Sequence, residues 1–286
     1  MSATPATWTV LSMLEWTTDY FTKKGVKSPR LSIEWLLAFV LQKKRLDLYL
    51  CFDRPLTSEE LEKLRPLVKR RSLQEPLQYI VGETDFFNVV INVNEHVLIP
   101  RQETEQLVQR ILNAHPRSEP LKVLDVGTGS GCIPISLKTE NSEWDITATD
   151  ISKEALELAT ANAARNNTAI TFIHQDLFNP HFENANSQFD VIISNPPYIL
   201  REEEQGLDEE VKNYEPHLAL FCESTDHIFS ALENYCSKFL AENGKAYFEI
   251  HEHEAAQTAQ VFSAKGWDVK ILSDYDLKER FLVISR

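Results

Sequence analysis

The sequence predicts an α/β protein in which a doubly wound, largely parallel sheet follows a small helical domain. Strand-like and helix-like segments alternate from residue 121 to the end of the chain. The first 80 residues have only helical apolar spacing. A glycine-rich turn joins the first strand of the alternating region to a helix, as in nucleotide-binding α/β folds. At 286 residues the chain is long enough for two domains.

Residues 1–80 predict a helical domain. Ser28 and Pro29 suit an N-cap and a first helical turn, and the apolar residues that follow have helical spacing. Thr57 and Glu60 form a capping-box pattern ahead of another apolar helix. We therefore expect a small helical bundle that ends near residue 75.

Residues 81–105 predict a β-hairpin connector. Strand formers run from Phe86 to Val93, and Val97 to Ile99 form a second run. The turn residues Asn92 to Glu95 lie between the two runs, so we expect the hairpin to turn there. Pro100 ends the second run, and helical spacing resumes from Thr104 to Leu112.

Residues 106–286 predict the doubly wound domain. Helical patterns at 153–166 and 226–240 lie between the predicted strands. Those strands are 121–126, 145–149, 170–174, 191–194, 244–250, 269–272 and 281–284.

Charge and composition exclude several classes of protein. Residues 1–80 hold 13 Lys and Arg against 9 Asp and Glu, a net charge of +4. Residues 81–286 hold 16 against 34, a net charge of −18, and this acidic region disfavours unaided binding to duplex DNA. No apolar run is long enough to span a bilayer, and no signal peptide is recognisable. The four cysteines are scattered, which favours reduced thiols over disulfides or a zinc site.

The glycine-rich turn is the first candidate site. Gly127, Gly129 and Gly131 follow a strand and open a helix, so the backbone there can turn tightly and approach a ligand. An ordinary tight turn is the alternative. Asp150 ends the next strand. A carboxylate there can accept hydrogen bonds from both hydroxyls of a ribose, or it can cap the following helix.

The third and fourth strands end in further candidate residues. Asp176 and Leu177 could contact an adenine ring, although Asp176 could equally cap its own loop. After the fourth strand, the oxygen of Asn195 and a carbonyl of Pro196 can accept both hydrogens of a planar NH2 group. Such acceptors stabilise positive charge that grows on the nitrogen during methylation. Tyr198 offers a flat face for stacking.

The order DVGTGSG, ATD, QDLF and SNPPY resembles that of the class I methyltransferases, which have a Rossmann-like fold. The blocks Glu75–Glu105 and Tyr214–Leu220 resemble those of the peptide chain release factor glutamine methyltransferases, the PrmC/HemK family. The resemblance implies methylation of the N5 side-chain amide of the glutamine in the GGQ motif of class I release factors. S-adenosylmethionine would be the donor and S-adenosylhomocysteine the product.

The same resemblance implies roles for individual residues. It assigns the cofactor to Gly127, Thr128, Gly129, Ser130, Gly131, Asp150, Asp176, Leu177 and Asn195. It assigns catalysis and the target glutamine to Asn195, Pro196, Pro197 and Tyr198. It places Arg101, Glu103 and Thr104 at the cofactor edge or the substrate approach. The expected protein is a cytoplasmic monomer that uses no metal, and neither membrane nor nucleic acid is an expected partner.

Three positions depart from the family's pattern. Gln102 replaces a proline in the IPRQETE block, His251 replaces a glycine, and Arg280 matches a terminal arginine only loosely. The alternatives are methylation of a ribosomal-protein glutamine and N6-methylation of adenine in DNA, because adenine also has a planar NH2. The IPRQETE block favours a release factor, and the acidic catalytic region disfavours DNA.

Weaker signals have ordinary interpretations. His251 and His253 lack the further ligands of a metal site, and Cys132 is more typical of a buried thiol than of a nucleophile. The basic runs Lys43–Arg45 and Lys69–Arg71 suit a solvated helix face. We hypothesise that Lys69–Arg71 docks onto an acidic face of the substrate, making residues 1–80 a substrate-recognition domain.

Overall fold

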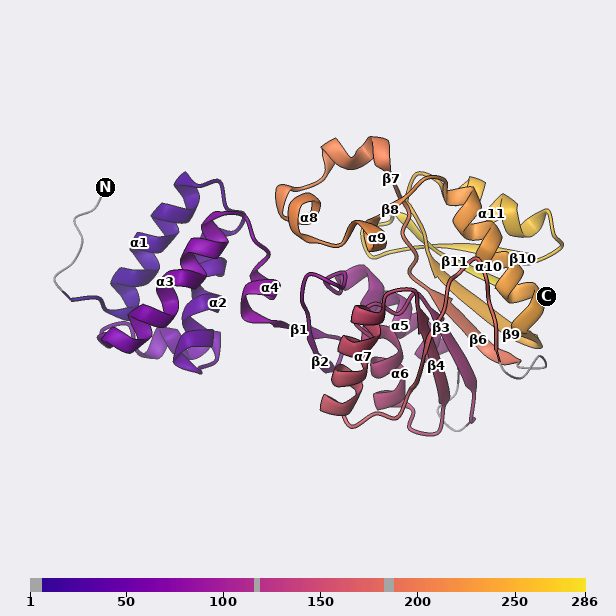
Figure 1. The fold of residues 1–286 in the computed structure, drawn as a ribbon, viewed down its shortest axis with the longest axis horizontal. Helices are drawn as coiled ribbons and strands as arrows, with labels where there is room; N and C mark the ends of the chain where they lie inside the picture. Colours follow the sequence, from indigo (N-terminus) through magenta and orange to yellow (C-terminus); the bar gives the residue numbers. More distant parts are fainter. Residues whose placement is uncertain (1–6, 116–118, 183–187) are drawn as a thin grey trace. The chain divides into compact units, whose positions relative to one another are not determined.

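The computed structural model describes residues 7–115, 119–182 and 188–286 (Figure 1). The chain divides into two compact units. The helical unit comprises Met1–Gly82 with Asp208–Tyr214, and the sheet unit comprises Glu83–Leu207 with Glu215–Arg286. Within the described ranges, no helix is both long enough and apolar enough to cross a bilayer.

The helical unit is a small bundle whose apolar faces meet in one core. Leu14, Phe21, Ile33 and Leu37 are fully buried in it. The predicted capping box is confirmed, because the Glu60 N–H donates to the Thr57 hydroxyl at 3.2 Å and the Thr57 N–H donates to the Glu60 carboxylate at 2.9 Å. The elements are α1 (Val10–Lys23), α2 (Pro29–Leu41), the 3-10 helix η1 (Arg45–Leu50), α3 (Ser58–Ser72), α4 (Leu77–Val81) and α8 (Glu209–Tyr214).

Ser28 precedes α2, and Pro29 is its first residue, as predicted. The Ser28 side chain makes no cap hydrogen bond, however. Its backbone has φ 46 and ψ 60, which is left-handed, whereas a side-chain cap usually requires an extended backbone. The helix begins where the sequence predicts, but the proline at its start rather than a serine cap accounts for this.

The helix α8 belongs to the helical unit although it lies far along the chain. Arg71 is 3% exposed, and its guanidinium donates to Glu210 of α8 at 2.7 Å. The Tyr214 hydroxyl donates to the backbone oxygen of Leu73 at 2.7 Å. Arginine is suited to such a buried pair because its planar fork satisfies several acceptors at once.

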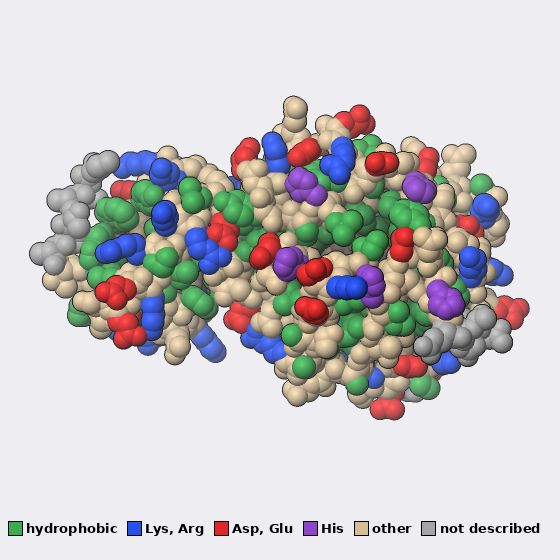
Figure 2. Space-filling view, viewed as in Figure 1, with side chains coloured by type: hydrophobic (Ala, Val, Ile, Leu, Met, Phe, Trp, Pro, Cys, Tyr) green, Lys and Arg blue, Asp and Glu red, His purple; other side chains and the backbone are tan. Residues whose placement is uncertain are grey.

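These contacts limit which residues of the run Lys69–Arg71 can take part in the docking that we hypothesise. Arg71 is buried against Glu210, and Arg70 makes an ion pair with Glu75. The side chains of Lys69 and Arg70 are exposed but that of Arg71 is not, so the run is not a continuous basic face. Figure 2 shows hydrophobic side chains exposed among the Lys and Arg side chains of this unit. Charge reversal of all three residues would therefore disturb folding as well as any docking.

The sheet unit is built on a seven-stranded sheet of order β10-β11-β9-β6-β3-β4-β5. The run β9-β6-β3-β4-β5 is parallel, and β11 is antiparallel to both of its neighbours. All seven strands were predicted, which confirms the fold class. They are β3 (Lys122–Val126), β4 (Asp145–Asp150), β5 (Thr171–His174), β6 (Phe189–Ser194), β9 (Leu240–Glu249), β10 (Asp268–Ser273) and β11 (Glu279–Ser285).

Helices cover the sheet in two groups. In one group α6 (Cys132–Glu140) and α7 (Lys153–Arg165) pack on β4, and α5 (Gln102–Ala114) packs on α6 and β9. In the other, α10 (Thr225–Phe239) packs on β9 and α11 (Ala255–Ser263) on β10 and β11. The chain leaves β3 toward β4 and later leaves β6 toward β9, in the opposite direction. Right-handed crossovers then place the two groups on opposite faces.

The hairpin prediction was wrong in its register. The observed hairpin pairs β1 (Glu83–Phe86) with β2 (Val89–Asn92), and the chain turns at Phe87 and Asn88, not at Asn92–Glu95. A polar contact explains why Val97–Ile99 forms no strand. The Ile99 N–H donates to the Glu215 carboxylate at 3.2 Å, so it is not available to a strand partner.

Short elements connect the fourth strand to the second half of the unit. The strands β7 and β8 pair in parallel beside the carboxyl end of β6. The short elements are β7 (Ile199–Leu200), the 3-10 helix η2 (Arg201–Gly206), α9 (His217–Leu220) and β8 (Phe221–Cys222). None of them was predicted, since each is too short to carry a periodic pattern.

Candidate active site

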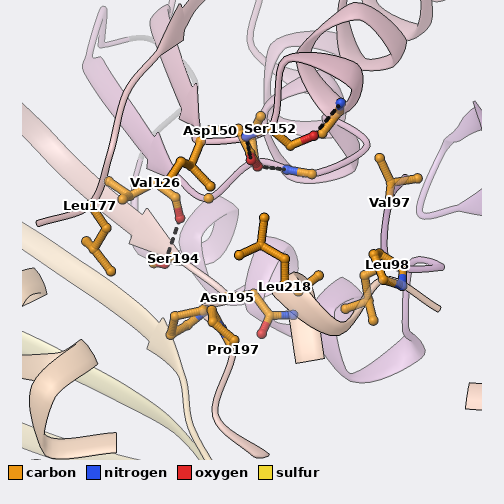
Figure 3. A pocket seen from close by; sticks show the side chains of 18 of the residues that line it. Val97, Leu98, Val126, Asp150, Ser152, Leu177, Ser194, Asn195, Pro197 and Leu218 are labelled. Atoms are coloured by element: carbon orange, nitrogen blue, oxygen red, sulfur yellow. Dashed lines mark hydrogen bonds between the residues drawn. The ribbon is translucent and has the colours of Figure 1, made fainter. Parts of the chain in front are cut away.

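A cavity of about 520 Å³ lies at the carboxyl ends of β3, β4, β5 and β6. These four strands are consecutive in the sheet order, and the chain reverses its winding between β3 and β6. Ligands bind at such switch points in doubly wound sheets, in cavities of roughly 300 to 1,000 Å³. Figure 3 shows Asp150, Leu177, Asn195 and Leu218 gathered around this cavity.

The glycine loop forms one wall of the cavity. Gly127 and Gly129 have φ values of 77 and 54, which favour glycine. A Cβ on either residue would meet nothing within 4 Å, so the backbone faces open space. The Gly127 and Thr128 N–H groups both donate to the Thr149 oxygen at 2.9 Å, which holds the loop against β4. The loop is therefore shaped for a ligand and anchored to the sheet.

Asp150 holds the same loop from the end of β4. Its two oxygens accept hydrogen bonds from the backbone N–H groups of Gly129 at 2.8 Å and Ser152 at 2.9 Å. Ser152, not Asp150, caps α7, since its hydroxyl accepts from Ala155. Burial raises the pKa of Asp150. The carboxylate is fixed at the cavity wall with lone pairs left for a hydroxyl-bearing ligand.

Asp176 and Leu177 line the cavity at the end of β5. The Asp176 oxygens accept from the Phe178 N–H at 2.9 Å and from the Asn179 side chain at 3.0 Å, so this residue does cap its own loop. The Phe178 ring stacks on His227 with ring centres 4.5 Å apart. The end of β5 thus offers one carboxylate and apolar surface to a ring-shaped ligand.

Asn195 enters the cavity from the end of β6 and is held by a buried network. The Ser194 hydroxyl donates to the Val126 oxygen at 2.7 Å, which ties the strand end to β3. The Asn195 side-chain NH2 donates to the Thr104 hydroxyl at 3.1 Å. Thr104 donates to Glu249 at 2.7 Å, and the Tyr198 hydroxyl donates to the same carboxylate at 3.0 Å.

Glu249 was not predicted as a site residue. It is the last residue of β9 and is 1% exposed. Burial raises its pKa, while the hydrogen bonds from Thr104 and Tyr198 lower it. A single glutamate at the end of a strand has no motif around it. The only sequence signal was a charged residue directly after an apolar β run, where a buried charge requires partners.

The two blocks that carried the resemblance to release factor glutamine methyltransferases meet in a second buried contact. Arg101 donates to Glu215 at 2.6 Å, and the Glu215 side chain is 1% exposed. The cavity brings together most of the predicted site residues, but Gly131, Glu103 and Tyr198 do not line it. Those that do are Arg101, Thr104, Gly127, Thr128, Gly129, Ser130, Asp150, Asp176, Leu177, Asn195, Pro196 and Pro197.

Two further buried groups lie at the base of the glycine loop. Asp125 of β3 is 0% exposed, and neither of its oxygens has a well-formed hydrogen bond. Burial raises its pKa to about 7, although the nearby Thr128 hydroxyl lowers it. Burial also raises the pKa of the Cys132 thiol to about 12, so this cysteine is a poor nucleophile.

The histidines His251 and His253 have other neighbours. His251 lies 3.4 Å from Glu203, and its ring meets that of Tyr198 edge-on with centres 6.0 Å apart. Among the residues that the structure describes, no three His, Cys, Asp or Glu side chains form a group that could hold a metal.

The strand order, the antiparallel β11 and the cavity at the switch point define a class I methyltransferase domain. Solved structures support the fold. The catalytic domain of hMettl16 is similar with a TM-score of 0.54 and 16% identity, over 77% of this chain and 80% of that chain. A methyltransferase from Pyrococcus furiosus is similar with a TM-score of 0.51 and 18% identity, over 69% of this chain and 89% of that chain.

Sequence comparisons identify the family. Residues 12–82 match the PrmC N-terminal domain, and residues 102–212 match the methyltransferase small domain. The release factor glutamine methyltransferase of Leptospira interrogans is 40% identical over 97% of this chain and 98% of its own length. That of Chlorobaculum tepidum is 37% identical over 96% of each. The chain belongs to the release factor glutamine methyltransferase family.

Proposed function

We propose that this protein transfers a methyl group from S-adenosylmethionine to the N5 side-chain amide of the glutamine in the GGQ motif of class I release factors. The observation that carries the proposal is Asn195. Its amide is anchored through its NH2 end at a cavity that a cofactor can share. Membership of the release factor glutamine methyltransferase family supports the choice of substrate.

The cavity fits the cofactor by size and by its polar groups. The open glycine loop and the fixed Asp150 suit an adenosine-bearing ligand, and Asp176 and Leu177 suit its ring. S-adenosylmethionine, when bound, supplies a methyl group on a positively charged sulfur. Gly127 to Ser130, Asp150, Asp176, Leu177 and Asn195 would hold it, and Gly131 would shape the loop from outside the cavity lining.

The chain's own residues would activate the target nitrogen. The lone pair of an amide nitrogen is delocalised, so the nitrogen needs both orientation and charge stabilisation. The Asn195 oxygen and the Pro196 carbonyl would accept its two N–H hydrogens and stabilise the positive charge that grows during transfer. Pro196 and Pro197 keep the backbone rigid. Transfer would form one N–C bond and break the S–CH3 bond, so that S-adenosylhomocysteine leaves as a neutral thioether and one N–H proton passes to water.

The surrounding assignments follow from this chemistry. Tyr198 would flank the planar amide, and Arg101, Glu103 and Thr104 would border the approach. The helical unit would recognise the release factor, and residues 81–105 would connect it to the catalytic domain. We infer a monomer without a metal, acting in the cytoplasm where translation takes place; the four unpaired cysteines suit that compartment.

Methyl transfer to three candidate substrates tests the proposal. Labelled S-adenosylmethionine is offered in parallel to a class I release factor, a ribosomal protein and duplex DNA. We expect label only in the release factor, and none when its GGQ glutamine is replaced by alanine. Label in DNA adenine or in the ribosomal protein would overturn the assignment of substrate.

A variant at the proposed acceptor tests the mechanism. Asn195→Ala removes the amide oxygen, and removal of one such preorganised group typically costs about 10²- to 10³-fold in kcat. We expect that loss in a folded variant whose unfolding temperature falls by only about 2–4 °C, because the Asn195–Thr104 hydrogen bond is also lost. Retained turnover would refute the role given to Asn195.

A further inference from the structure

Glu249 joins both ends of the NPPY tetrapeptide. Its Oε1 accepts from the Tyr198 hydroxyl at 3.0 Å, so the last residue of the tetrapeptide binds it directly. Its Oε2 accepts from the Thr104 hydroxyl at 2.7 Å, and that hydroxyl accepts from the Asn195 NH2 at 3.1 Å. The first residue is thus connected to the same carboxylate through Thr104.

The chemistry of these groups sets the direction of the hydrogen bonds. A threonine hydroxyl has one hydrogen, and an ionised carboxylate can only accept. Thr104 gives its hydrogen to Glu249, so its oxygen can only accept from Asn195. The Asn195 side chain must then face Thr104 with its NH2 group. A flipped amide would place two oxygens against each other with no hydrogen between them.

We propose that Thr104 and Glu249 are positioning residues that hold the Asn195 carbonyl oxygen free to accept from the substrate NH2. The inference rests on the proposed function. Without this control the Asn195 NH2 could turn toward the substrate, where two sets of donors would repel each other. The transition state would then lose one acceptor at the nitrogen where positive charge grows. Neither positioning residue needs to touch the substrate.

The burial of Glu249 agrees with a positioning role. A fully buried carboxylate costs folding free energy unless donors compensate for the lost water. Glu249 has such donors in the Thr104 and Tyr198 hydroxyls, and both belong to segments that border the cavity. Arg280 of β11 also stabilises its negative charge, because Arg280 lowers the pKa of Glu249.

The main test compares two substitutions at Thr104. Thr104→Val removes the hydroxyl at nearly constant volume, and Thr104→Ser retains it. With purified release factor, we expect kcat of the valine variant to fall about 10- to 100-fold, mainly without a rise in KM, since the lost stabilisation belongs to the transition state. The serine variant should retain most of the wild-type kcat. Affinity for S-adenosylhomocysteine should remain close to that of the wild type in both.

A second pair tests Glu249. Glu249→Met keeps the length of the side chain without an acceptor, whereas Glu249→Gln keeps one oxygen that can still accept from Thr104. The methionine variant should lose about as much kcat as Thr104→Val, and the glutamine variant should lose less. Thr258→Val removes a buried hydroxyl in α11, outside the cavity lining, and is the matched control. It should retain full activity.

Acid provides a readout that a purely structural role would not give. A protonated Glu249 can donate, which allows the hydrogen bonds to reverse and the Asn195 amide to flip. We therefore expect kcat to fall at low pH in the wild type and much less in Glu249→Gln. The groups that face Glu249 are Thr104 and Glu103 on α5, Tyr198 after β6, Arg280 on β11 and Cys132 on α6.

The outcomes separate this inference from the proposed function. Equal damage from Thr104→Ser and Thr104→Val, or wild-type kcat in Glu249→Met, would overturn the positioning role. Crystal structures of the two Thr104 variants give an answer without any substrate. If the Asn195 amide has the same position and orientation in the valine variant as in the wild type, the inference is wrong. If the wild type methylates no glutamine but the amide moves only in the valine variant, the proposed function fails and the positioning role stands.

Discussion

Two buried carboxylates in the sheet unit have opposite surroundings. Glu249 at the end of β9 accepts from two hydroxyls, whereas neither oxygen of Asp125 in β3 has a well-formed hydrogen bond. Burial raises the pKa of both, and that of Asp125 reaches about 7. Burial alone therefore does not define the role of a carboxylate. Its hydrogen-bond donors decide whether a buried carboxylate positions its neighbours or only lowers the stability of the fold when it is charged.

The largest predicted effect concerns Asp125 and pH. A carboxyl whose pKa is near 3.9 unfolded and about 7 folded binds its proton more tightly in the folded state. The contribution of Asp125 to the free energy of unfolding is fully present below pH 4 and is lost as pH rises through 7. The total is about 4 kcal/mol by linkage. Denaturant unfolding at pH 5 and pH 8 should show Asp125→Asn losing far less stability between them than the wild type.

The matched control for that experiment is Glu249→Gln. It removes the other buried carboxyl and leaves Asp125 in place, so most of the wild-type decline in stability between pH 5 and pH 8 should persist. If Asp125→Asn and the wild type had the same pH dependence, Asp125 would not titrate in this range.

A smaller effect is expected at Glu249 itself. Glu249→Met leaves the Thr104 and Tyr198 hydroxyls without their acceptor, and each buried unsatisfied group costs about 1–3 kcal/mol. Addition of Thr104→Val removes one of these stranded hydroxyls. In a double-mutant cycle at pH 7 the loss for the pair should therefore be smaller than the sum of the single losses. Additive losses would mean that the Thr104–Glu249 bond has no energetic weight.

The sequence predicted what depends on local pattern. The strand ends that carry Gly127, Asp150, Asp176 and Asn195 were placed correctly, because alternating strands and helices bring their carboxyl ends to one edge. The Thr57 capping box was also predicted, since it needs only two side chains three residues apart. Such features depend on neighbours in the chain.

The missed features depend on contacts between distant segments. The hairpin register was wrong because Glu215, more than 100 residues away, takes the Ile99 N–H. The expected solvated position of Arg71 was wrong because Glu210 of α8 pairs with it. Glu249 was missed for the same reason, as its partners come from α5 and from the residues after β6. The sequence pattern places Glu249 on a strand, but the hydroxyls that donate to its carboxylate can be identified only from the fold.

The smallest predicted effect separates the two bonds of Glu249. Tyr198→Phe removes one donor, retains the ring for stacking and leaves the Thr104 bond in place, so it should cost about 1 kcal/mol of stability. The Tyr198 hydrogen bond lowers the pKa of Glu249, so its removal should raise that pKa. The decline of kcat in acid should then move to higher pH. A pH–rate profile of the variant against the wild type measures this. A move to lower pH would mean that a group other than Glu249 controls the decline, because loss of a donor cannot stabilise a carboxylate.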